Sequence, residues 1–135
     1  MTKAAKTTSW VFQIIAVIIM GQTLAFKFSG HPTTLAIFEE INMPYGHIII
    51  GVLELAACIL LLMPQSIVYG ATLGAGLMTG AIIGHITELG WEGERGQLGL
   101  LAIATLVSCN IVLFIRRKDI PLIKGILSES NLPKD

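Results

Sequence analysis

Four stretches of the chain are almost wholly apolar, and they cover residues 10–26, 47–63, 67–86 and 98–115. Each approaches the roughly 20 residues that an α-helix needs to cross the hydrocarbon core of a membrane. Strands of a membrane barrel would instead alternate apolar and polar positions over about ten residues. Because lipid offers no hydrogen bonds, each stretch must satisfy its own backbone as a helix. The pattern predicts an all-α integral membrane four-helix bundle, built as a single domain over residues 1–135.

The links between these stretches carry prolines, glycines and polar residues, and they differ in length. Residues 64–66 form a tight turn, so the second and third stretches are predicted to form an antiparallel hairpin. The first link is longer, and apolar residues recur along it at roughly helical spacing, at Leu35, Ile37, Phe38 and Ile41. This spacing predicts a short amphipathic helix on the membrane surface, which starts near Pro32 and ends before Pro44.

The distribution of Lys and Arg predicts how the helices are oriented. With four spans both termini lie on one side, and that side holds seven of the nine cations: Lys3, Lys6, Arg116, Arg117, Lys118, Lys124 and Lys134. Cations concentrate on the cytoplasmic side, so both termini and the basic tail of residues 116–135 are expected there. Lys27 and Arg95 are expected on the other side. The basic residues that follow the last stretch are interpreted as a stop-transfer signal in contact with anionic lipid.

The start of the chain permits a second interpretation. Lys3 and Lys6, the first apolar stretch and the sequence Thr23-Leu24-Ala25 loosely imitate a secretory signal peptide. The distribution of Lys and Arg does not distinguish a retained helix from a cleaved signal peptide, because cleavage would leave the other spans oriented in the same way. We expect the first stretch to be retained, because it and the residues after it fit a family pattern described below.

Composition narrows the range of functions. Hydrophobic residues make up 53% of the chain and charged residues 13%, and nine cations balance nine acids. A chain with this charge balance lacks the excess of basic residues that nucleic-acid binding needs, and its high hydrophobic content excludes intrinsic disorder. Two cysteines are too few for a disulfide scaffold or a four-ligand zinc site. The three histidines stand at positions 31, 47 and 85 and fit no compact ligand spacing, so no metal site is predicted.

The third apolar stretch carries five glycines at helical spacing, which are Gly70, Gly74, Gly76, Gly80 and Gly84. Small residues four positions apart let helix backbones approach closely in lipid. Such a face serves either packing inside the bundle or a dimerisation surface or ligand groove. We expect that these glycines pack inside the bundle.

Glu54 lies in the middle of the second stretch, where an ionisable side chain is costly and normally faces the bundle interior. His47, Gly51 and Cys58 share its face of the helix. At a rise of about 1.5 Å per residue, Glu54 lies about 15 Å and Gln22 about 18 Å from the cytoplasmic ends of their helices. Gln22 is therefore expected to hydrogen-bond Glu54 across the glycine face.

Two interpretations of these polar residues stay open. In the first, Gln22, Lys27, His47, Glu54 and His85 line a polar ligand cavity open to the outer face, with Glu54 as the candidate catalytic acid. In the second, Glu54 is a hydrogen-bonded structural acid. Lys27 and the two histidines are then simply wetted at the membrane boundary.

Four other polar or sulfur-containing residues within the apolar stretches are given structural roles. Cys58 and Cys109 reach similar depths, so a redox pair is geometrically possible. Without a neighbouring cation they are expected to be packing residues instead. Gln13 and Asn110 lie toward the cytoplasmic ends and are expected to hold helices together by hydrogen bonds.

Several short motifs along residues 10–115 occur in a combination typical of one family. They are Lys27-Phe28-x-Gly30-x-Pro32, a surface segment with Phe38, Gly51-Val52-Leu53-Glu54-Leu55, Leu62-Met63-Pro64, Gly70-Ala71 and Met78-x-Gly80-Ala81, ending in His85. In these motifs the chain resembles the DoxX family. The resemblance implies a small four-helix protein of the bacterial inner membrane, and it singles out Glu54 as the matching acid. It implies no catalytic set, because the family offers no accepted one.

The resemblance and the residues together lead to two hypotheses of different class. Members of the DoxX family are linked to thiosulfate:quinone oxidation and to oxidative-stress assemblies, which implies a subunit or accessory of a membrane redox system, with a quinone as its ligand. If the chain takes part in catalysis, we expect it to be a component of a membrane oxidoreductase rather than an enzyme on its own. Distant eukaryotic relatives look like chaperones or cargo receptors, which implies a non-catalytic module that holds a partner or a second copy of itself. The sequence carries no haem histidine pair, dinucleotide loop or redox dithiol.

Overall fold

In the computed structural model, which describes residues 1–120, the chain is helical and contains no strand within that part. Five α-helices follow one another: α1 (Lys3–Phe28), α2 (Pro32–Glu40), α3 (Gly46–Leu62), α4 (Ile67–Gly84) and α5 (Glu94–Ile115). A π-helical turn, η1 (His85–Leu89), continues α4, and a 3₁₀ turn, η2 (Arg117–Asp119), follows α5. The all-α prediction is confirmed. Residues 121–135, with most of the predicted tail, lie outside the described part.

Three helical segments are long and apolar enough to cross a membrane: α1, α4 together with η1, and α5. α3 is equally apolar in character but shorter, at 17 residues. Two helices begin well before their apolar stretches for local reasons. α1 starts at Lys3 because the Thr2 side chain accepts a hydrogen bond from the Ala5 amide. α5 starts after Gly90 and Gly93, whose positive φ angles of 75° and 62° reverse the chain.

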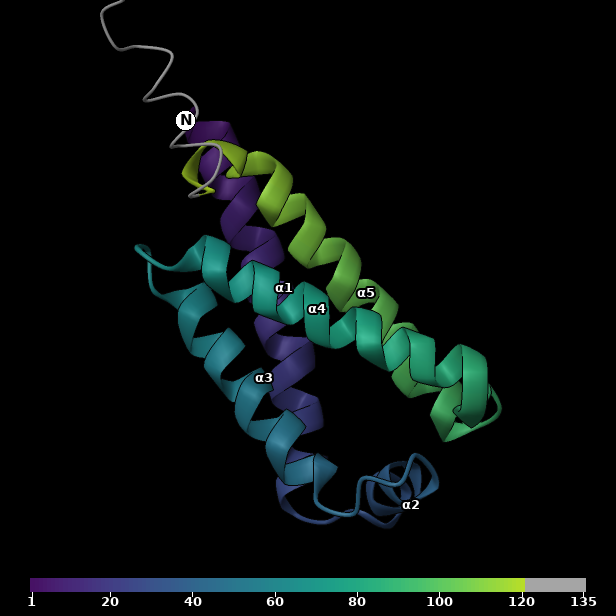
Figure 1. Cartoon of the computed structure of the whole chain (residues 1–135). Helices are drawn as coiled ribbons and strands as arrows, with labels where there is room; N and C mark the ends of the chain where they lie inside the picture. Colours follow the sequence, from purple (N-terminus) through teal and green to yellow (C-terminus); the bar gives the residue numbers. More distant parts are fainter. Residues whose placement is uncertain (121–135) are drawn as a thin grey trace, which may run out of the picture.

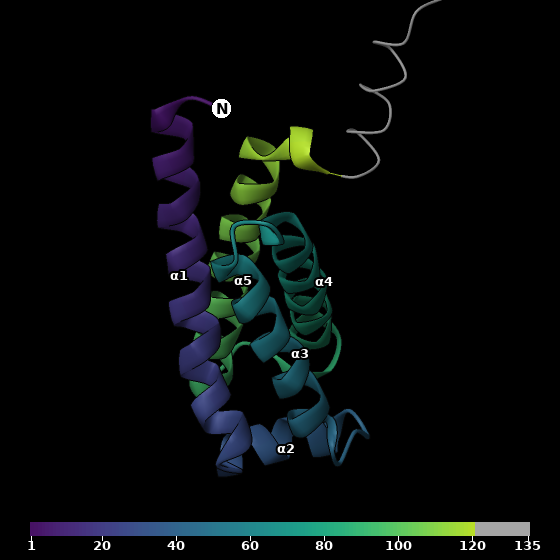
Figure 2. The same ribbon diagram turned by 90° about the vertical axis from the view of Figure 1, so that its left-hand side faces the viewer.

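The long helices pack as neighbours around a common interior (Figures 1 and 2). α1 lies against α3 and α5, and α4 lies against the same two helices. α3 and α4 form the predicted hairpin, which is closed tightly near its turn and widens away from it (Figure 1). At the wide end, the short helix α2 lies across the space between the helices. The fold is therefore narrow at one end and open at the other.

A buried polar network closes the narrow end. Arg116 Nε donates to Ser9 Oγ over 2.7 Å, and Ser9 Oγ donates to Gln13 Oε1 over 2.7 Å. Gln13 Nε2 then donates to the Leu61 carbonyl oxygen over 2.7 Å. Hydrogen bonds between polar groups that lipid cannot satisfy hold α1, α3 and the end of α5 together. The prediction for Gln13 is confirmed, whereas Asn110 is exposed and makes no side-chain hydrogen bond within residues 1–120.

Arg116 corrects another expectation. We predicted a lipid-facing cation, but only 7% of this residue is exposed, because its side chain turns inward to reach Ser9. Burial lowers the pKa of the guanidinium, and the charge of Asp119 opposes that change. The contact also places the start of α1 and the end of α5 at the same end of the molecule (Figure 1).

Candidate functional site

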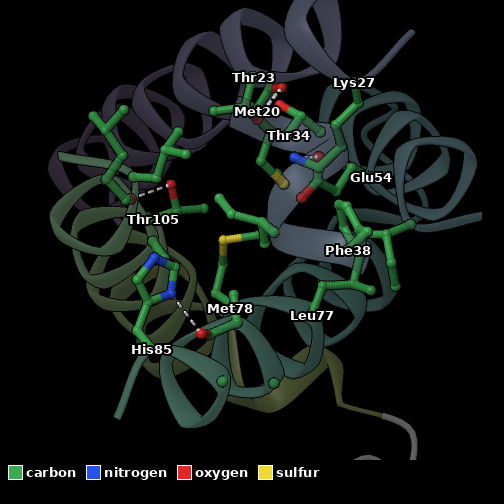
Figure 3. A pocket seen from close by; sticks show the side chains of 18 of the residues that line it. Met20, Thr23, Lys27, Thr34, Phe38, Glu54, Leu77, Met78, His85 and Thr105 are labelled. Atoms are coloured by element: carbon green, nitrogen blue, oxygen red, sulfur yellow. Dashed lines mark hydrogen bonds and ion pairs between the residues drawn. The ribbon is translucent and has the colours of Figure 1, made fainter. Parts of the chain in front are cut away.

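A cavity of about 360 Å³ fills the space where the helices separate (Figure 3). α1, α3, α4, η1 and α5 form its sides, and α2 closes the end opposite the Arg116 network. Most of the side chains that line it are apolar, as in sites for drug-sized ligands, which occupy about 300–1,000 Å³. A small number of polar groups interrupt this surface, and they determine what the cavity can bind.

The strongest polar feature is an ion pair between α1 and α3. Lys27 Nζ lies 3.0 Å from Glu54 Oε2, and only 3% of Glu54 is exposed. This distance makes a close charge contact, but within the described residues Oε2 makes no hydrogen bond of acceptable geometry. The oxygen therefore keeps capacity to accept a proton or a hydrogen bond from a ligand. The prediction that Glu54 faces the interior is confirmed, and Lys27 lines the same cavity (Figure 3).

Gln22 does not take the part predicted for it. Its side chain is exposed, and the partner of Glu54 is Lys27, with Thr23 also on the cavity wall. The rise along α1 places Gln22 near the depth of Glu54. The helix also turns by about 100° per residue, however, and this turn points Gln22 away from Glu54. Met20, Thr23 and Lys27 recur at intervals of three and four and so share one face of α1, which is the signal that identifies Lys27.

His85 faces the cavity from the side opposite the ion pair (Figure 3). Its Nδ1 lies 2.8 Å from the Ala81 carbonyl oxygen. Because a carbonyl can only accept, Nδ1 carries the hydrogen, and in the neutral ring Nε2 is an acceptor. Nε2 is buried and has no partner among the described residues. His85, of which only 5% is exposed, thus offers an unused acceptor to the cavity.

The π-helical turn explains the position of this ring. His85 begins η1, and the Gly90 amide donates back to the His85 carbonyl oxygen over 2.9 Å, which is an i to i+5 bond. Such turns are rare and occur frequently at functional sites. The Trp91 ring centroid lies 5.3 Å from that of the imidazole, and Gly99 leaves room for both rings, since a Cβ atom there would clash with Trp91 Cζ3 and lie 3.1 Å from His85 Cδ2. This turn could not be predicted from sequence, since hydropathy reports apolar length and not hydrogen-bond register.

His47 lies outside the cavity. It is half-buried at the start of α3, and its ring centroid is 6.4 Å from that of Phe38, which is itself part of the wall. The predicted stripe of α3 does face inward, since Gly51, Glu54 and Cys58 are all buried. His47 shares their face but lies one turn too far toward the end of the helix. The structure therefore unites three of the five predicted cavity residues and leaves out Gln22 and His47.

The glycines of α4 divide into two groups, and only the first packs as predicted. A Cβ atom at Gly70 would lie 2.6 Å from the Leu61 backbone nitrogen, so α3 and α4 touch there through their backbones. A Cβ atom at Gly74 would lie 3.0 Å from Cys109 Sγ. At Gly76 and Gly80, however, a Cβ atom would meet nothing within 4 Å. The prediction of packing is wrong for these two, because α3 and α4 have already separated at that level.

Gly76, Gly80 and Gly84 line the cavity instead. The nearest atom to a Cβ at Gly84 would be Leu89 Cδ1, at an ordinary contact distance of 3.8 Å. These three glycines therefore border the space of the cavity rather than a closely packed helix.

α2 supplies the end wall of the cavity. Thr34 and Ile37 are buried on its inner face, and Phe38 lines the cavity beside them, so the amphipathic helix is where the spacing predicted it. Its outer side is tied to the start of α5, where Arg95 makes two hydrogen bonds to the Glu40 carboxylate, with N···O distances of 2.8 and 3.1 Å. The sequence did not indicate that Thr34 would join the site, since nothing in the link showed which of its threonines would face inward.

Neither cysteine contributes to the cavity. Cys58 and Cys109 are both buried as free thiols among the core side chains of the bundle, in keeping with a packing role. Within residues 1–120, no three His, Cys, Asp or Glu side chains are arranged to hold a metal ion. The polar groups of the cavity are therefore the candidate chemistry of this part of the chain.

Comparison with protein-family models, curated proteins and solved structures finds no match for this chain. Its function must be inferred from the cavity itself. The cavity combines an apolar body with a buried acid–amine pair on one side and an unused imidazole nitrogen on the other. Such a site suits an amphipathic small molecule whose polar head both donates and accepts hydrogen bonds.

Proposed function

We propose that the chain is a four-span protein of the bacterial inner membrane with both termini in the cytoplasm. Three segments have the required length, and α3 contacts both α1 and α4. α3 is about 26 Å long at about 1.5 Å per residue, close to the about 30 Å of the hydrocarbon core. The contact between Arg116 and Ser9 joins the end of α5 to the start of α1, as an even number of crossings requires. The excess of Lys and Arg on that side supports the orientation.

We further propose that the cavity binds a lipophilic molecule of the quinone class, and that the chain is a subunit or accessory of a membrane redox system, as the resemblance to the DoxX family implies. The observation that carries this proposal is the buried pair of Lys27 and Glu54 on the wall of an apolar cavity. Ionisable groups inside a membrane are costly, and they commonly mark ligand or proton pathways. A quinone needs both an apolar surface and groups that exchange protons.

The chemistry assigns a role to each group. Reducing a quinone to a quinol consumes two electrons and two protons, and the protons join the two carbonyl oxygens. A redox partner subunit would supply the electrons. Lys27 would donate a hydrogen bond to one carbonyl oxygen, and Glu54 would relay to it one proton taken up from water. His85 Nε2 would relay the second proton, also taken up from water, to the carbonyl oxygen on the far side of the ring, and would then accept a hydrogen bond from the hydroxyl formed there.

Binding is tested with the fluorescence of Trp91, whose ring centroid lies 5.3 Å from that of the cavity residue His85. The full chain carrying Trp10→Phe, which leaves Trp91 as the only tryptophan, is placed in phosphatidylcholine nanodiscs and titrated with a decyl-chain benzoquinone. Saturable quenching is expected. Lys27→Met should weaken binding about tenfold, since it removes a hydrogen bond from a charged donor. Gln22→Leu is the matched control, because Gln22 is polar and on the same helix but faces away from the cavity.

Absence of saturable quenching in the unsubstituted protein would contradict the proposal. Purification with native lipids gives an independent measurement, in which co-purifying small molecules are identified by mass spectrometry. A quinone in the extract supports the redox role. A stoichiometric protein partner with no small molecule would instead support the non-catalytic assembly module.

A further inference from the structure

We infer that the cavity opens sideways into the lipid between α3 and α4, and that its ligand is a single-chain lipid. The polar head would lie beside Lys27 and Glu54, while the chain leaves the protein past Gly76 and Gly80. This inference rests on the proposed function, because it takes the cavity to be a ligand site. It adds the route by which the ligand enters and the shape that the ligand must have.

The exposure of the wall residues locates the opening. Most of the side chains around the cavity are buried or half-buried, but Gly76 and Gly80 on α4 are exposed although they line it. Met43, just before α3, is the third exposed residue of the wall. These residues lie along the gap between α3 and α4. On the other sides, the facing residues of α1 and α5 have no exposed member in the wall.

The hairpin geometry explains why an opening forms there. Contact of Gly70 with the α3 backbone holds the two helices together near their turn. Beyond it they separate (Figure 1), and the side of α4 that borders the gap carries hydrogen atoms instead of side chains at Gly76 and Gly80. Ile50 of α3 and Leu77 of α4 are the larger residues that frame the opening on either side. Any residue with a branched side chain at the two glycine positions would fill it.

The opening faces hydrocarbon rather than water. Gly76 lies nine residues after the start of α4 at Ile67, which is about 14 Å at about 1.5 Å per residue. That depth is near the middle of a hydrocarbon core about 30 Å thick. The outer surfaces of the two helices carry exposed apolar side chains, such as Ile49 and Ile83. A molecule entering here comes from the acyl chains of the bilayer.

The volume of the cavity requires the chain of the ligand to leave. A cavity of about 360 Å³ lies at the lower end of the about 300–1,000 Å³ that sites for drug-sized ligands occupy. That is enough for a substituted ring and the first carbons of a chain, but not for a whole lipid. The exit past the glycines is a single gap between two helices, which suits one chain rather than the two chains of a phospholipid.

The test blocks the opening without disturbing the fold. A Cβ atom at either glycine meets nothing within 4 Å, and replacing a helical glycine removes its propensity cost of about 1 kcal/mol, so the double variant Gly76→Leu, Gly80→Leu should fold. Two probes with the same head are compared by Trp91 quenching at equilibrium: a benzoquinone without a chain, and its decyl-chain analogue. Thr79→Leu is the matched control, since Thr79 is an exposed residue of α4 outside the cavity.

The double variant should lose about tenfold more affinity for the decyl-chain probe than for the chainless probe, because the added side chains compete with the chain for one gap. Both glycines line the cavity, so the quantity to compare is the ratio of the two affinities. Thr79→Leu should bind both probes like the parent. Equal binding of the decyl-chain probe by parent and double variant would overturn the lateral exit, as would an equal loss for both probes. Failure of the parent protein to bind either probe would instead overturn the proposed function, and the route with it.

Discussion

Lys27 and Glu54 form a pair whose stability depends on both members. Removing one partner of a buried ion pair leaves an uncompensated charge, while replacing both by neutral groups of similar size is often tolerated. Lys27 is the more accessible of the two, with 13% of its side chain exposed, so its charge retains some access to solvent or to a ligand. This asymmetry makes Glu54 the group that depends on Lys27 rather than the reverse.

Lys27→Met should therefore destabilise the protein by up to about 3 kcal/mol, because it leaves the buried Glu54 carboxylate without its counterion. The double variant Lys27→Met, Glu54→Gln should recover most of that loss. Unfolding of the purified protein in mixed detergent micelles measures both. If the double variant loses as much stability as the two single variants, Lys27→Met and Glu54→Gln, lose together, the two side chains do not interact in the folded state.

Contacts between individual side chains were harder to predict from sequence than the helices themselves. The inward face of Glu54 followed from its depth in an apolar stretch, since an acid in lipid must turn inward. Its partner did not follow, because helices place side chains by rotation as well as by depth, and only Lys27 satisfied both. The unused nitrogen of His85 depends on a π-turn whose hydrogen bonds leave no trace in composition.

At the scale of helices, hydropathy predicted the elements well, because apolar length is what a spanning helix requires. The four apolar stretches correspond to α1, α3, α4 with η1, and α5. The spacing of apolar residues in the first link also predicted α2. What the pattern could not separate was glycines that pack against a helix and glycines that line a cavity. Gly70 and Gly80 each have another glycine four residues away, but whether a neighbouring helix lies opposite depends on the angle between α3 and α4.

This difference predicts opposite effects for one chemical change. Gly70→Ala should lower the free energy of unfolding by about 1–3 kcal/mol, because its Cβ would lie 2.6 Å from the Leu61 backbone nitrogen. Gly80→Ala, the matched substitution on the same helix, should be neutral or stabilising by up to about 1 kcal/mol. Unfolding of the two variants under identical conditions gives the comparison. Equal destabilisation by both would show that α4 packs tightly along its whole length.

At the scale of the whole molecule, the narrow end holds the helices together and the open end contains the cavity. Buried hydrogen bonds among Ser9, Gln13 and Arg116 fix the helices at one end. At the other end, α2 and its ties to α5 close a cavity that the helices leave between them. The fold class was predictable from sequence, but this division was not, because it arises from contacts between residues far apart in the chain.

The proposed topology predicts the positions of the chain termini and of the α4–α5 link. A reporter fused after Asp135 should be active in the cytoplasm. A cysteine introduced by Glu92→Cys, in a variant that also carries Cys58→Ala and Cys109→Ala, should react with a membrane-impermeant maleimide added to whole cells whose outer membrane has been permeabilised. Lys3→Cys in the same background should react only after the cells are lysed. A C-terminal reporter active only outside the cytoplasm would rule out this arrangement.

The bond between Arg116 and Ser9 joins residues 107 positions apart. During biosynthesis, the first helix enters the membrane long before its partner at the end of the last helix has been made. Until then, Ser9 Oγ has no donor from Arg116 and must accept from water or lipid headgroups near the membrane surface. The completed contact is thus available only to a full set of helices. A nascent chain that stops short would keep this acceptor without its partner, and membrane quality-control proteases would have a chemical mark by which to tell it from the finished protein.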